Sequence, residues 1–334
     1  MIKVLFVGNY LSKSKGTFGV SEHIAQVLPK SRFGVRLTSR KQNRFFRLID
    51  IVLNCSFTTF STIQIDTFSG SAFIIAEVAS LIAKFRGKKI ILTLHGGKLP
   101  EFFLHNKKRI KRVFQRSNRI QTPSLYLQQF FRENGTDVNY LPNPIPIRNF
   151  PYNRSNIKLH TLLWVRAFTE IYNPDLVVKT LYEVRKKYPE ATLTMVGPDK
   201  GLLQQTIKLI QKLDLTSCIN ITGPVKNDEL YKYYQTHEVI VNTTSYESFG
   251  VAVAEAASCG IPIVSSAVGE LPYLYQHNEN ILLVEDLSES SFSTEVIRLM
   301  ESPELAQKLS LNARKRVEAF DWEIIKPKWI ELLS

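Results

Sequence analysis

Two glutamates, Glu247 and Glu255, stand eight residues apart in the stretch SYESFGVAVAEAASCGIP, which is otherwise mostly small and apolar. A carboxylate accepts hydrogen bonds from two neighbouring hydroxyls, which sugars and ribose both present. Glu247 is expected in a loop after a strand at 238–244, and Glu255 about one and a half turns into the helix that follows from Gly250. The pattern predicts a site for a hydroxyl-rich ligand. Taken alone, this spacing is equally typical of a dipole contact and a solvated helix face.

The start of the same helix is also suited to phosphate. The first N–H groups of a helix lack intrahelical partners and carry partial positive charge. A glycine at position 250 lets the backbone approach a ligand closely. Glutamates for hydroxyls beside amides for phosphate indicate a nucleotide or a sugar phosphate.

His95 is a second candidate. It comes at the end of the predicted strand 88–96 and directly before Gly96 and Gly97. A lone histidine is more often a structural residue. In open α/β sheets, however, ligands bind outside the carboxyl ends of the strands, which is where His95 is predicted to lie.

The elements that must position these residues alternate between β-rich runs and helical patterns, which is typical of parallel sheets covered by helices. In the first half the predicted strands are 3–8, 49–54, 62–68, 88–96 and 119–123, and the predicted helices are 21–29, 71–85 and 101–116. In the second half the strands are 161–167, 191–197, 218–223, 238–244 and 261–266, and the helices are 174–188, 201–213, 227–235 and 250–259.

The 334 residues suit two domains of roughly 150 residues each. The proline-rich stretch LPNPIPIRNFPYNRSN separates the halves, because its prolines continue neither a helix nor a central strand. We therefore expect an α/β protein with two Rossmann-like domains whose parallel sheets face each other across a cleft. The predicted parts are a first domain over 1–145, a linker over 146–158, a second domain over 159–318 and a C-terminal helix over 319–334 that crosses back to the first domain.

Composition narrows the class and the compartment. No segment approaches the ~20 apolar residues of a membrane span, and the start MIKVLFVGNY is typical of a first strand rather than a signal peptide. The three cysteines show no metal-ligand spacing and are expected to be buried free thiols in a reducing cytoplasm.

The excess of positive over negative charge is confined to the first half. Residues 1–150 hold 24 Lys and Arg against 7 Asp and Glu, whereas residues 151–334 hold 19 against 23. The excess gathers at 39–47, 84–89 and 105–116, which indicates an anionic partner. The last cluster, with Ile110, Val113 and Phe114, is typical of a basic amphipathic surface helix, and we expect it to dock on an anionic membrane.

The stretch ESFGVAVAEAASCGIPIV resembles the glutamate–seven residues–glutamate region of retaining glycosyltransferases of family 4 at nearly every position. The resemblance covers the second half, including MVGPDK, ITGPV and AVGELPYL, and is looser in the first half, at TFGVSEHIAQVL, LTLHGG and LPNPI. It implies the two-domain GT-B fold and retaining, metal-independent transfer from a nucleotide-diphosphate sugar of UDP or GDP type. The implied acceptor is a glycan or lipid-linked glycan of cell-surface polysaccharide synthesis, reached by a cytoplasmic enzyme at the inner face of the membrane.

The resemblance also implies roles for individual residues. Glu247 stabilises positive charge on the donor sugar, Arg166 pairs with the diphosphate, and His95 contacts the sugar; these three are the implied catalytic residues. Glu255 holds the ribose. The other implied donor-binding residues are Gly19 in an amino-terminal loop, Gly197 and Pro198 beside the nucleotide, Gly223 and Val225 against its base, and Ser248, Phe249, Gly250 and Val251, whose backbone meets the sugar and diphosphate.

One feature departs from the family pattern. The family places a lysine about five residues beyond the arginine as a second cation for the diphosphate, and RAFTEIYNPDL contains none. The next lysine is Lys179, which falls in the predicted helix 174–188. Asn173, the helix dipole or a cation from the basic first half are the alternatives for this contact.

Three other functions are alternatives to a glycosyltransferase. A GT-B sugar-nucleotide epimerase needs acid and base groups that the sequence does not place. A non-catalytic nucleotide-sugar-binding protein is favoured only by the missing lysine. A nucleic-acid-binding protein fits the basic half, but no recognition module appears, and Phe45, Phe46 and Phe114 at helical spacing are typical of a core. No acidic pair or His/Cys/Asp cluster indicates a metal, so we expect none, no other cofactor and no nucleic acid.

Overall fold

The computed structural model describes residues 1–10 and 20–334. Within them the chain forms two compact units, one over Met1–Pro144 with Glu323–Ser334 and one over Ile145–Trp322. Every strand pairing among the described residues is parallel, so the predicted α/β class is confirmed.

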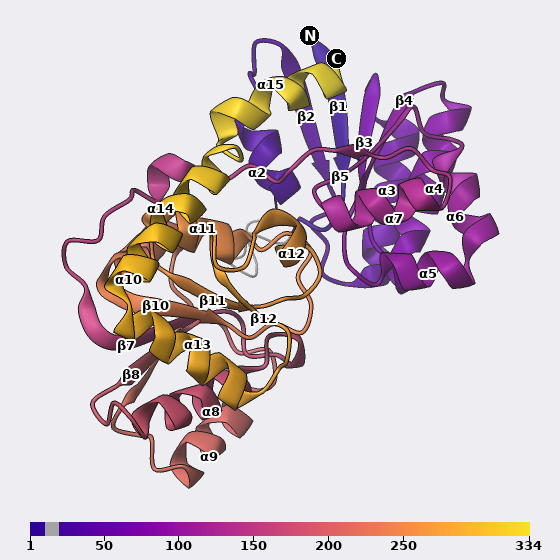
Figure 1. The fold of residues 1–334 in the computed structure, drawn as a ribbon. Helices are drawn as coiled ribbons and strands as arrows, with labels where there is room; N and C mark the ends of the chain where they lie inside the picture. Colours follow the sequence, from indigo (N-terminus) through magenta and orange to yellow (C-terminus); the bar gives the residue numbers. More distant parts are fainter. Residues whose placement is uncertain (11–19) are drawn as a thin grey trace. The chain divides into compact units, whose positions relative to one another are not determined.

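The described part of the first unit contains a six-stranded sheet in the order β2-β1-β3-β4-β5-β6 (Figure 1). Its strands are β1 (Ile2–Val7), β2 (Phe33–Thr38), β3 (Thr62–Thr67), β4 (Lys89–Leu94), β5 (Arg119–Thr122) and β6 (Asn139–Tyr140). Its helices are α2 (Val20–Val27), α3 (Arg44–Phe57), α4 (Phe73–Phe85), α5 (Leu99–His105), α6 (Lys107–Phe114) and α7 (Leu125–Glu133), with the short helix η1 (Gly70–Ala72). Helix α15 (Trp322–Leu333) packs here too, because the Lys89 ammonium donates to the Leu332 carbonyl at 2.9 Å.

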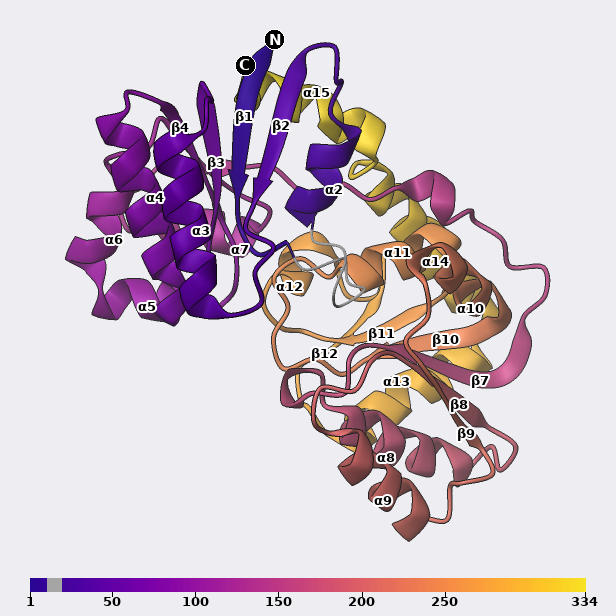
Figure 2. The same ribbon diagram turned by 180° about the vertical axis from the view of Figure 1, so that it is seen from behind.

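The second unit contains a sheet in the order β12-β11-β10-β7-β8-β9. Its strands are β7 (Lys158–Val165), β8 (Thr192–Val196), β9 (Ile219–Gly223), β10 (His237–Asn242), β11 (Ile263–Ser266) and β12 (Leu282–Val284). Its helices are α8 (Pro174–Arg185), α9 (Leu203–Lys212), α10 (Leu230–Thr236), α11 (Val251–Cys259), α12 (Leu271–Leu274), α13 (Glu289–Glu301) and α14 (Pro303–Glu318), with η2 (Ile147–Asn149), η3 (Glu170–Tyr172) and η4 (Asn227–Glu229). Figures 1 and 2 show α8, α9 and α13 on one side of this sheet and α10, α11 and α14 on the other.

The central strands are buried because helices cover both faces of each sheet. All six residues of β3 are buried, and the core of the second unit includes Trp164, Val239 and Val264 from three neighbouring strands. This arrangement brings the ends of β7, β8, β10 and β11 to one edge of the sheet, where the predicted site residues of the second half follow them.

Two predicted elements of the first half were wrong. Residues 49–54, predicted as a strand, lie inside helix α3. The Asn43 side chain starts this helix by accepting from the amides of Phe45 and Phe46, and Ile51, Asn54 and Cys55 are buried along its length, so a cap and one buried face outweighed the β-branched composition.

The predicted helix 101–116 is two helices, α5 and α6, because the backbone leaves helical geometry at Asn106. Its apolar residues Ile110, Val113 and Phe114 belong to the core of the first unit, whereas Lys107, Lys108 and Arg112 are exposed. Helix α6 is therefore amphipathic with its apolar side turned inward, and its docking on a membrane stays a prediction. The expectation that Phe45 and Phe46 are core residues was also wrong, since they are 68% and 59% exposed.

Candidate functional site

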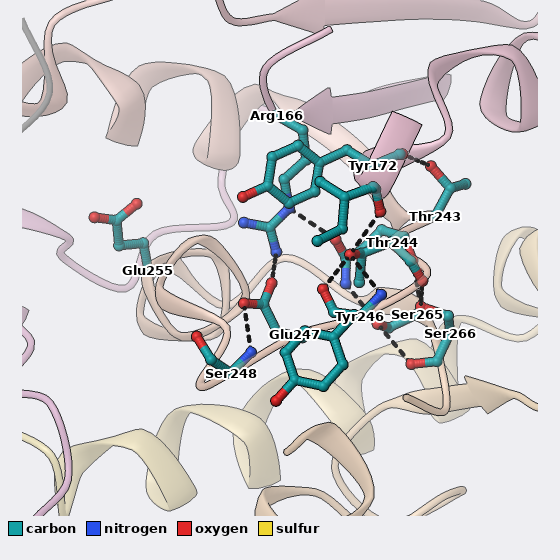
Figure 3. Close-up of polar contacts among 12 residues, drawn as sticks. Arg166, Tyr172, Thr243, Thr244, Tyr246, Glu247, Ser248, Glu255, Ser265 and Ser266 are labelled. Atoms are coloured by element: carbon teal, nitrogen blue, oxygen red, sulfur yellow. Dashed lines mark hydrogen bonds and ion pairs between the residues drawn. The ribbon is translucent and has the colours of Figure 1, made fainter. Parts of the chain in front are cut away.

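Arg166 and Glu247 form the centre of the candidate site in the second unit. Arg166 comes directly after β7, and Glu247 lies in the loop between β10 and α11. An Arg166 Nη2 donates to Glu247 Oε2 at 2.6 Å, and both side chains are nearly buried (Figure 3). A carboxylate and a guanidinium held together at the carboxyl edge of a parallel sheet match the predicted position of a ligand site.

Two further contacts fix the Arg166 guanidinium. Its Nε donates to Asn242 Oδ1 at 2.9 Å, and its Cζ lies 5.1 Å from the centre of the Tyr172 ring. The hydrogen bonds to Glu247 and Asn242 use two of the five guanidinium N–H groups. The remaining donors form a rigid fork of the kind that binds phosphate oxygens.

The loop of residues 267–270 seats Glu247. The Glu270 amide donates to the Glu247 carbonyl at 3.0 Å, and a Cβ at position 269 would come within 2.0 Å of that carbonyl oxygen. Gly269 also has a φ of +58°, so only glycine fits there without displacing Glu247. The role of Gly269 was not predicted from the sequence.

Glu255 has different partners. It lies in α11, where Oε1 accepts from Asn227 Nδ2 at 2.9 Å and Oε2 accepts from the Tyr234 hydroxyl at 3.4 Å. Figure 3 shows its carboxylate apart from the Arg166–Glu247 pair. The two glutamates therefore offer two separate acceptors, as expected if one takes the sugar and the other the ribose.

Burial changes the titration of Glu255. Removal from water raises the pKa of this carboxyl to about 7, although the bond from Asn227, the charge of Arg166 and the bond from Tyr234 all act to lower it. The same burial, with the Glu255 charge, raises the pKa of the Tyr234 phenol well above its ordinary value. Near neutral pH, Glu255 is thus divided between the acid and the carboxylate.

Two more of the predicted glycines, Gly197 and Gly223, lie where strands β8 and β9 end. A Cβ at Gly197 would lie 1.9 Å from the Arg166 carbonyl oxygen, so this glycine is required for contact with the strand end that carries Arg166. The Pro198 carbonyl accepts from the Phe168 amide at 3.0 Å. Gly223 ends β9, and Val225 follows in the loop that leads to Asn227.

The segment after Glu247 leads into α11. The Ser248 amide donates to Glu247 Oε1 at 3.1 Å, Gly250 is the N-cap residue and Val251 is the first residue of the helix. The Phe249 side chain is buried against the Phe320 ring, with 5.3 Å between ring centres. Phe249 therefore anchors the turn, and its backbone remains the part assigned to a ligand.

The position five residues beyond Arg166 is occupied by Ile171. Its carbonyl accepts from the Thr244 hydroxyl at 3.1 Å and from the Ser245 amide at 2.8 Å, so this segment is tied to the end of β10. Asn173 is one of the alternatives for the missing lysine. Its side-chain Nδ2 donates to the Thr243 carbonyl at 3.0 Å. Asn173 has a structural partner here, and Tyr172 supplies a ring beside Arg166.

His95 lies in the first unit, directly after β4. Its Nε2 is 3.1 Å from Asp66 Oδ1, and its ring stacks on Phe68 with 5.2 Å between ring centres. Burial acts to raise the pKa of the Asp66 carboxyl, but hydrogen bonds and charge from His95, with bonds from Gln64 and Ser21, hold it below its ordinary value. Asp66 is therefore ionised at neutral pH and accepts a hydrogen bond from Nε2–H of His95, which leaves Nδ1 outside this contact.

Asp66 is a residue of this region that was not predicted from the sequence. It lies near the end of β3 and is buried, and Ser21 and Gln64 donate to its Oδ1 at 2.7 and 3.0 Å. A Cβ at Gly8 would come within 2.6 Å of its Oδ2, so the backbone after β1 can approach Asp66 this closely only because this position is glycine. The available signal was an acidic residue inside the otherwise uncharged strand TIQIDTF.

Replacing Asp66 by asparagine is expected to lower the stability of the first unit by about 1–3 kcal/mol, because Ser21, Gln64 and His95 lose a charged acceptor. A carboxyl with a lowered pKa stabilises the folded state at neutral pH and loses that effect as the pH falls through its pKa in the folded protein. The difference in stability between the wild type and Asp66→Asn should therefore become smaller in acid. Thermal unfolding checks this, with the exposed Asp137→Asn as control. Nitrogen-15 NMR of His95 should show the Nε2–H form in the wild type and a mixture in Asp66→Asn; identical spectra would contradict the assigned pairing.

Among residues 1–10 and 20–334, no group of three or more His, Cys, Asp or Glu side chains is arranged to hold a metal ion. Gly19 lies outside the described residues. Within the described ranges no helix has the length and apolar character required to cross a bilayer.

Comparison with known proteins places the second half of the chain in a family. The family described as glycosyl transferases group 1 matches residues 148–316, slightly more than half of the sequence. D-inositol 3-phosphate glycosyltransferases from Streptomyces bingchenggensis and Frankia alni are 31% and 28% identical over 158 and 169 residues. These matches cover 45% and 48% of this chain and only 35% and 42% of those proteins.

Solved structures match the whole chain in fold. Sucrose-phosphate synthase from Thermosynechococcus elongatus has a TM-score of 0.79 at 17% identity, covering 99% of this chain and 98% of that one. Anabaena HepE in complex with UDP and glucose has a TM-score of 0.76 at 17% identity, covering 100% and 99%. With the family match over Arg166, Glu247 and Glu255 and this two-sheet architecture, the chain belongs to the glycosyl transferases group 1 family and has the GT-B fold.

Proposed function

We propose that the chain is a retaining glycosyltransferase of family 4 that transfers a sugar from a nucleotide-diphosphate sugar to a glycan or lipid-linked acceptor in cell-surface polysaccharide synthesis. The observation that carries the proposal is the Arg166–Glu247 pair at the edge of the second sheet. Guanidinium N–H groups that the bonds to Glu247 and Asn242 do not use remain for a ligand, and the start of α11 lies beside the pair. The name of the curated relatives and the UDP and glucose of the HepE complex support a nucleotide-sugar donor.

The proposed roles follow the chemistry of each side chain. The remaining Arg166 donors and the first amides of α11 bind the diphosphate, as cations and helix N-termini do. Glu247 accepts from the donor sugar and stabilises its positive charge. Glu255 accepts from the ribose hydroxyls, and the loops at Gly197 and Gly223 flank the nucleotide. The resemblance assigns His95 to the donor sugar, through Nδ1 because Asp66 holds Nε2.

The proposed transfer is a front-face substitution. The bond between the anomeric carbon and the diphosphate oxygen breaks while the acceptor oxygen bonds the same face of that carbon. The acceptor's proton passes to the leaving diphosphate, so no protein carboxylate is consumed and the configuration is retained. Stabilisation of the leaving group by Arg166 and the helix amides is then the main catalytic contribution.

The proposal includes independence from metal and attachment to an anionic membrane. Arg166 and the α11 amides supply the positive charge at the diphosphate that a divalent cation provides in metal-dependent glycosyltransferases. The excess of Lys and Arg in residues 1–150 supports attraction to anionic lipid and residence at the inner face of the membrane. No nucleic acid and no other cofactor is proposed as a partner.

A donor screen tests the proposal. Thermal shift with UDP, GDP and their sugars is expected to identify one base that stabilises the protein, because a ligand that binds only the folded state raises its unfolding temperature. The matching sugar nucleotide should then give transfer to a glycan acceptor with retained configuration, and EDTA should leave the rate unchanged.

The alternatives predict other outcomes. Loss of activity in EDTA with rescue by Mn²⁺ or Mg²⁺ would overturn metal independence. Release of an epimerised free sugar would indicate the epimerase. Tight donor binding without transfer to any acceptor would indicate a binding protein.

A further inference from the structure

Helix α3 carries a line of large apolar side chains on its outer surface. Phe45, Phe46, Ile49, Leu53 and Phe57, here called the α3 stripe, are between 41% and 80% exposed. Their spacing of three and four residues places them along one side of the helix. The opposite side of the helix is buried, so the helix presents apolar side chains both to the core and to the surface.

The α3 stripe belongs to a well-anchored helix. Asn43 caps its start, Arg47 Nε donates to the Lys41 carbonyl at 2.9 Å, and Thr58 Oγ1 donates to the Asn54 carbonyl at 2.6 Å at its end. Helix α4 lies beside it on the same side of the sheet and exposes Phe85 (84%) (Figure 2). Contiguous exposed apolar side chains of this size are typical of an interaction surface.

Positive charge flanks the α3 stripe at both ends. The basic segment 39–47 contains the N-terminal end of the α3 stripe. The basic segment 84–89 lies at its C-terminal end, because Arg86 Nη1 donates to the carbonyls of Cys55 and Thr58 at 2.6 and 2.9 Å. The single acidic residue in 39–58 is Asp50, whose carboxylate accepts from Thr38 and Asn54. The surface is therefore apolar along its middle and cationic at its ends.

We propose that α3 is the element that enters the membrane: it lies in the plane of an anionic bilayer, with the α3 stripe in the boundary between headgroups and acyl chains and the flanking Arg and Lys on lipid phosphates. Elements that lie in the interface of an anionic membrane combine exposed apolar area with cationic flanks in this way. A second copy is disfavoured as the occupant, because pairing two stripes brings like charges together. The inference deepens the proposed membrane attachment and places it on α3 in place of α6.

Vesicle flotation tests the inference with the full chain. Phosphatidylcholine vesicles with added phosphatidylglycerol are expected to bind the protein, and phosphatidylcholine alone to bind little. The triple variant Phe45→Ser, Ile49→Ser, Leu53→Ser should bind the anionic vesicles at least about tenfold more weakly. The matched control, Leu159→Ser with Leu311→Ser, removes exposed apolar side chains of the second unit and should bind as the wild type does.

Depth is measured with two tryptophan substitutions. Phe45→Trp should be quenched by brominated anionic lipid, whereas Lys107→Trp on α6 should be quenched much less. Wild-type binding by the triple variant, or quenching of Lys107→Trp alone, would overturn the inference. A wild-type dimer that the triple variant converts to a monomer would also overturn it, in favour of a second copy as the occupant.

The membrane result is separable from the donor site. Arg166, Glu247 and Glu255 belong to the second unit, so the triple variant should keep the thermal shift given by the nucleotide donor, which also shows that it folds. Vesicle binding without any donor shift in the wild type would support the membrane inference and contradict the proposed transferase.

Discussion

Replacing Glu247 by glutamine is expected to lower the turnover of sugar transfer about 100-fold or more, the usual effect of losing one contact that acts on charge in the transition state. Glu247 accepts from Arg166 at 2.6 Å and from the Ser248 amide at 3.1 Å, so its carboxylate is held in one orientation. Glutamine keeps the shape and removes the charge that stabilises the donor sugar. The effect should therefore fall on turnover more than on the Michaelis constant of the donor.

Glu170→Gln is the matched control, because this exposed carboxylate lies in η3, a few residues beyond Arg166. It should turn over near the wild-type rate. Loss of a buried pair also destabilises, so thermal unfolding with and without donor must show that Glu247→Gln is folded. Wild-type kinetics in a folded Glu247→Gln would remove Glu247 from the mechanism.

Replacing Glu255 by glutamine is expected to stabilise the protein at alkaline pH. The folded state raises the pKa of this carboxyl from its ordinary 4.5 to about 7. Between these two pH values the folded protein therefore holds a proton that the unfolded chain has lost. Stability from this group is fully present below the unfolded pKa and is lost as the pH rises through 7. At pH 8 the glutamine variant should be more stable by up to about 3 kcal/mol, and at acid pH the two proteins should be alike.

Calorimetric unfolding across this pH range measures the difference. Asn227→Ala is the matched control, because it keeps the carboxyl and removes the donor that lies 2.9 Å from Oε1. This variant should keep the wild-type trend of falling stability above neutral pH. A gap between wild type and Glu255→Gln that does not change with pH would show that Glu255 is not the titrating group.

The same substitution should weaken donor binding. Ribose hydroxyls donate to a carboxylate, so the proposed role requires the ionised form and the affinity of the wild type for a nucleotide sugar should increase as the pH rises through about 7. Glutamine should lower the affinity and abolish that pH dependence, with less effect on turnover than at Glu247. Calorimetric titration at several pH values decides this; unchanged affinity would separate Glu255 from the ribose.

The sequence predicted most of the second unit because its signals are local. Short β-branched runs, glycine turns and helical patterns identified strands β7 to β11 and helices α8 to α11 within a few residues. The rule that ligands bind beyond the carboxyl ends of parallel strands then indicated Glu247 and His95, and the family resemblance added Arg166. The class of fold followed from the alternation of elements.

Local signals failed where a distant contact decided the outcome. Residues 49–54 have strand composition, yet they form helix because Ile51 and Cys55 are buried against the rest of the unit. Asp66 was passed over because its partners Ser21 and His95 are 45 and 29 residues away. Neither the burial in α3 nor the contacts of Asp66 can be predicted from the residues that neighbour them in the sequence.

The chemistry of the candidate site depended on the same long-range contacts. The sequence by itself determined which residue types stand at the strand ends and that the first half carries the positive charge. Only the tertiary structure decided that Arg166 pairs with Glu247 across 81 residues, that burial brings Glu255 to a pKa of about 7, and that the α3 stripe stays exposed. The physical reason is that strand ends follow from short patterns, whereas burial and pairing depend on all the chain segments that pack around a group.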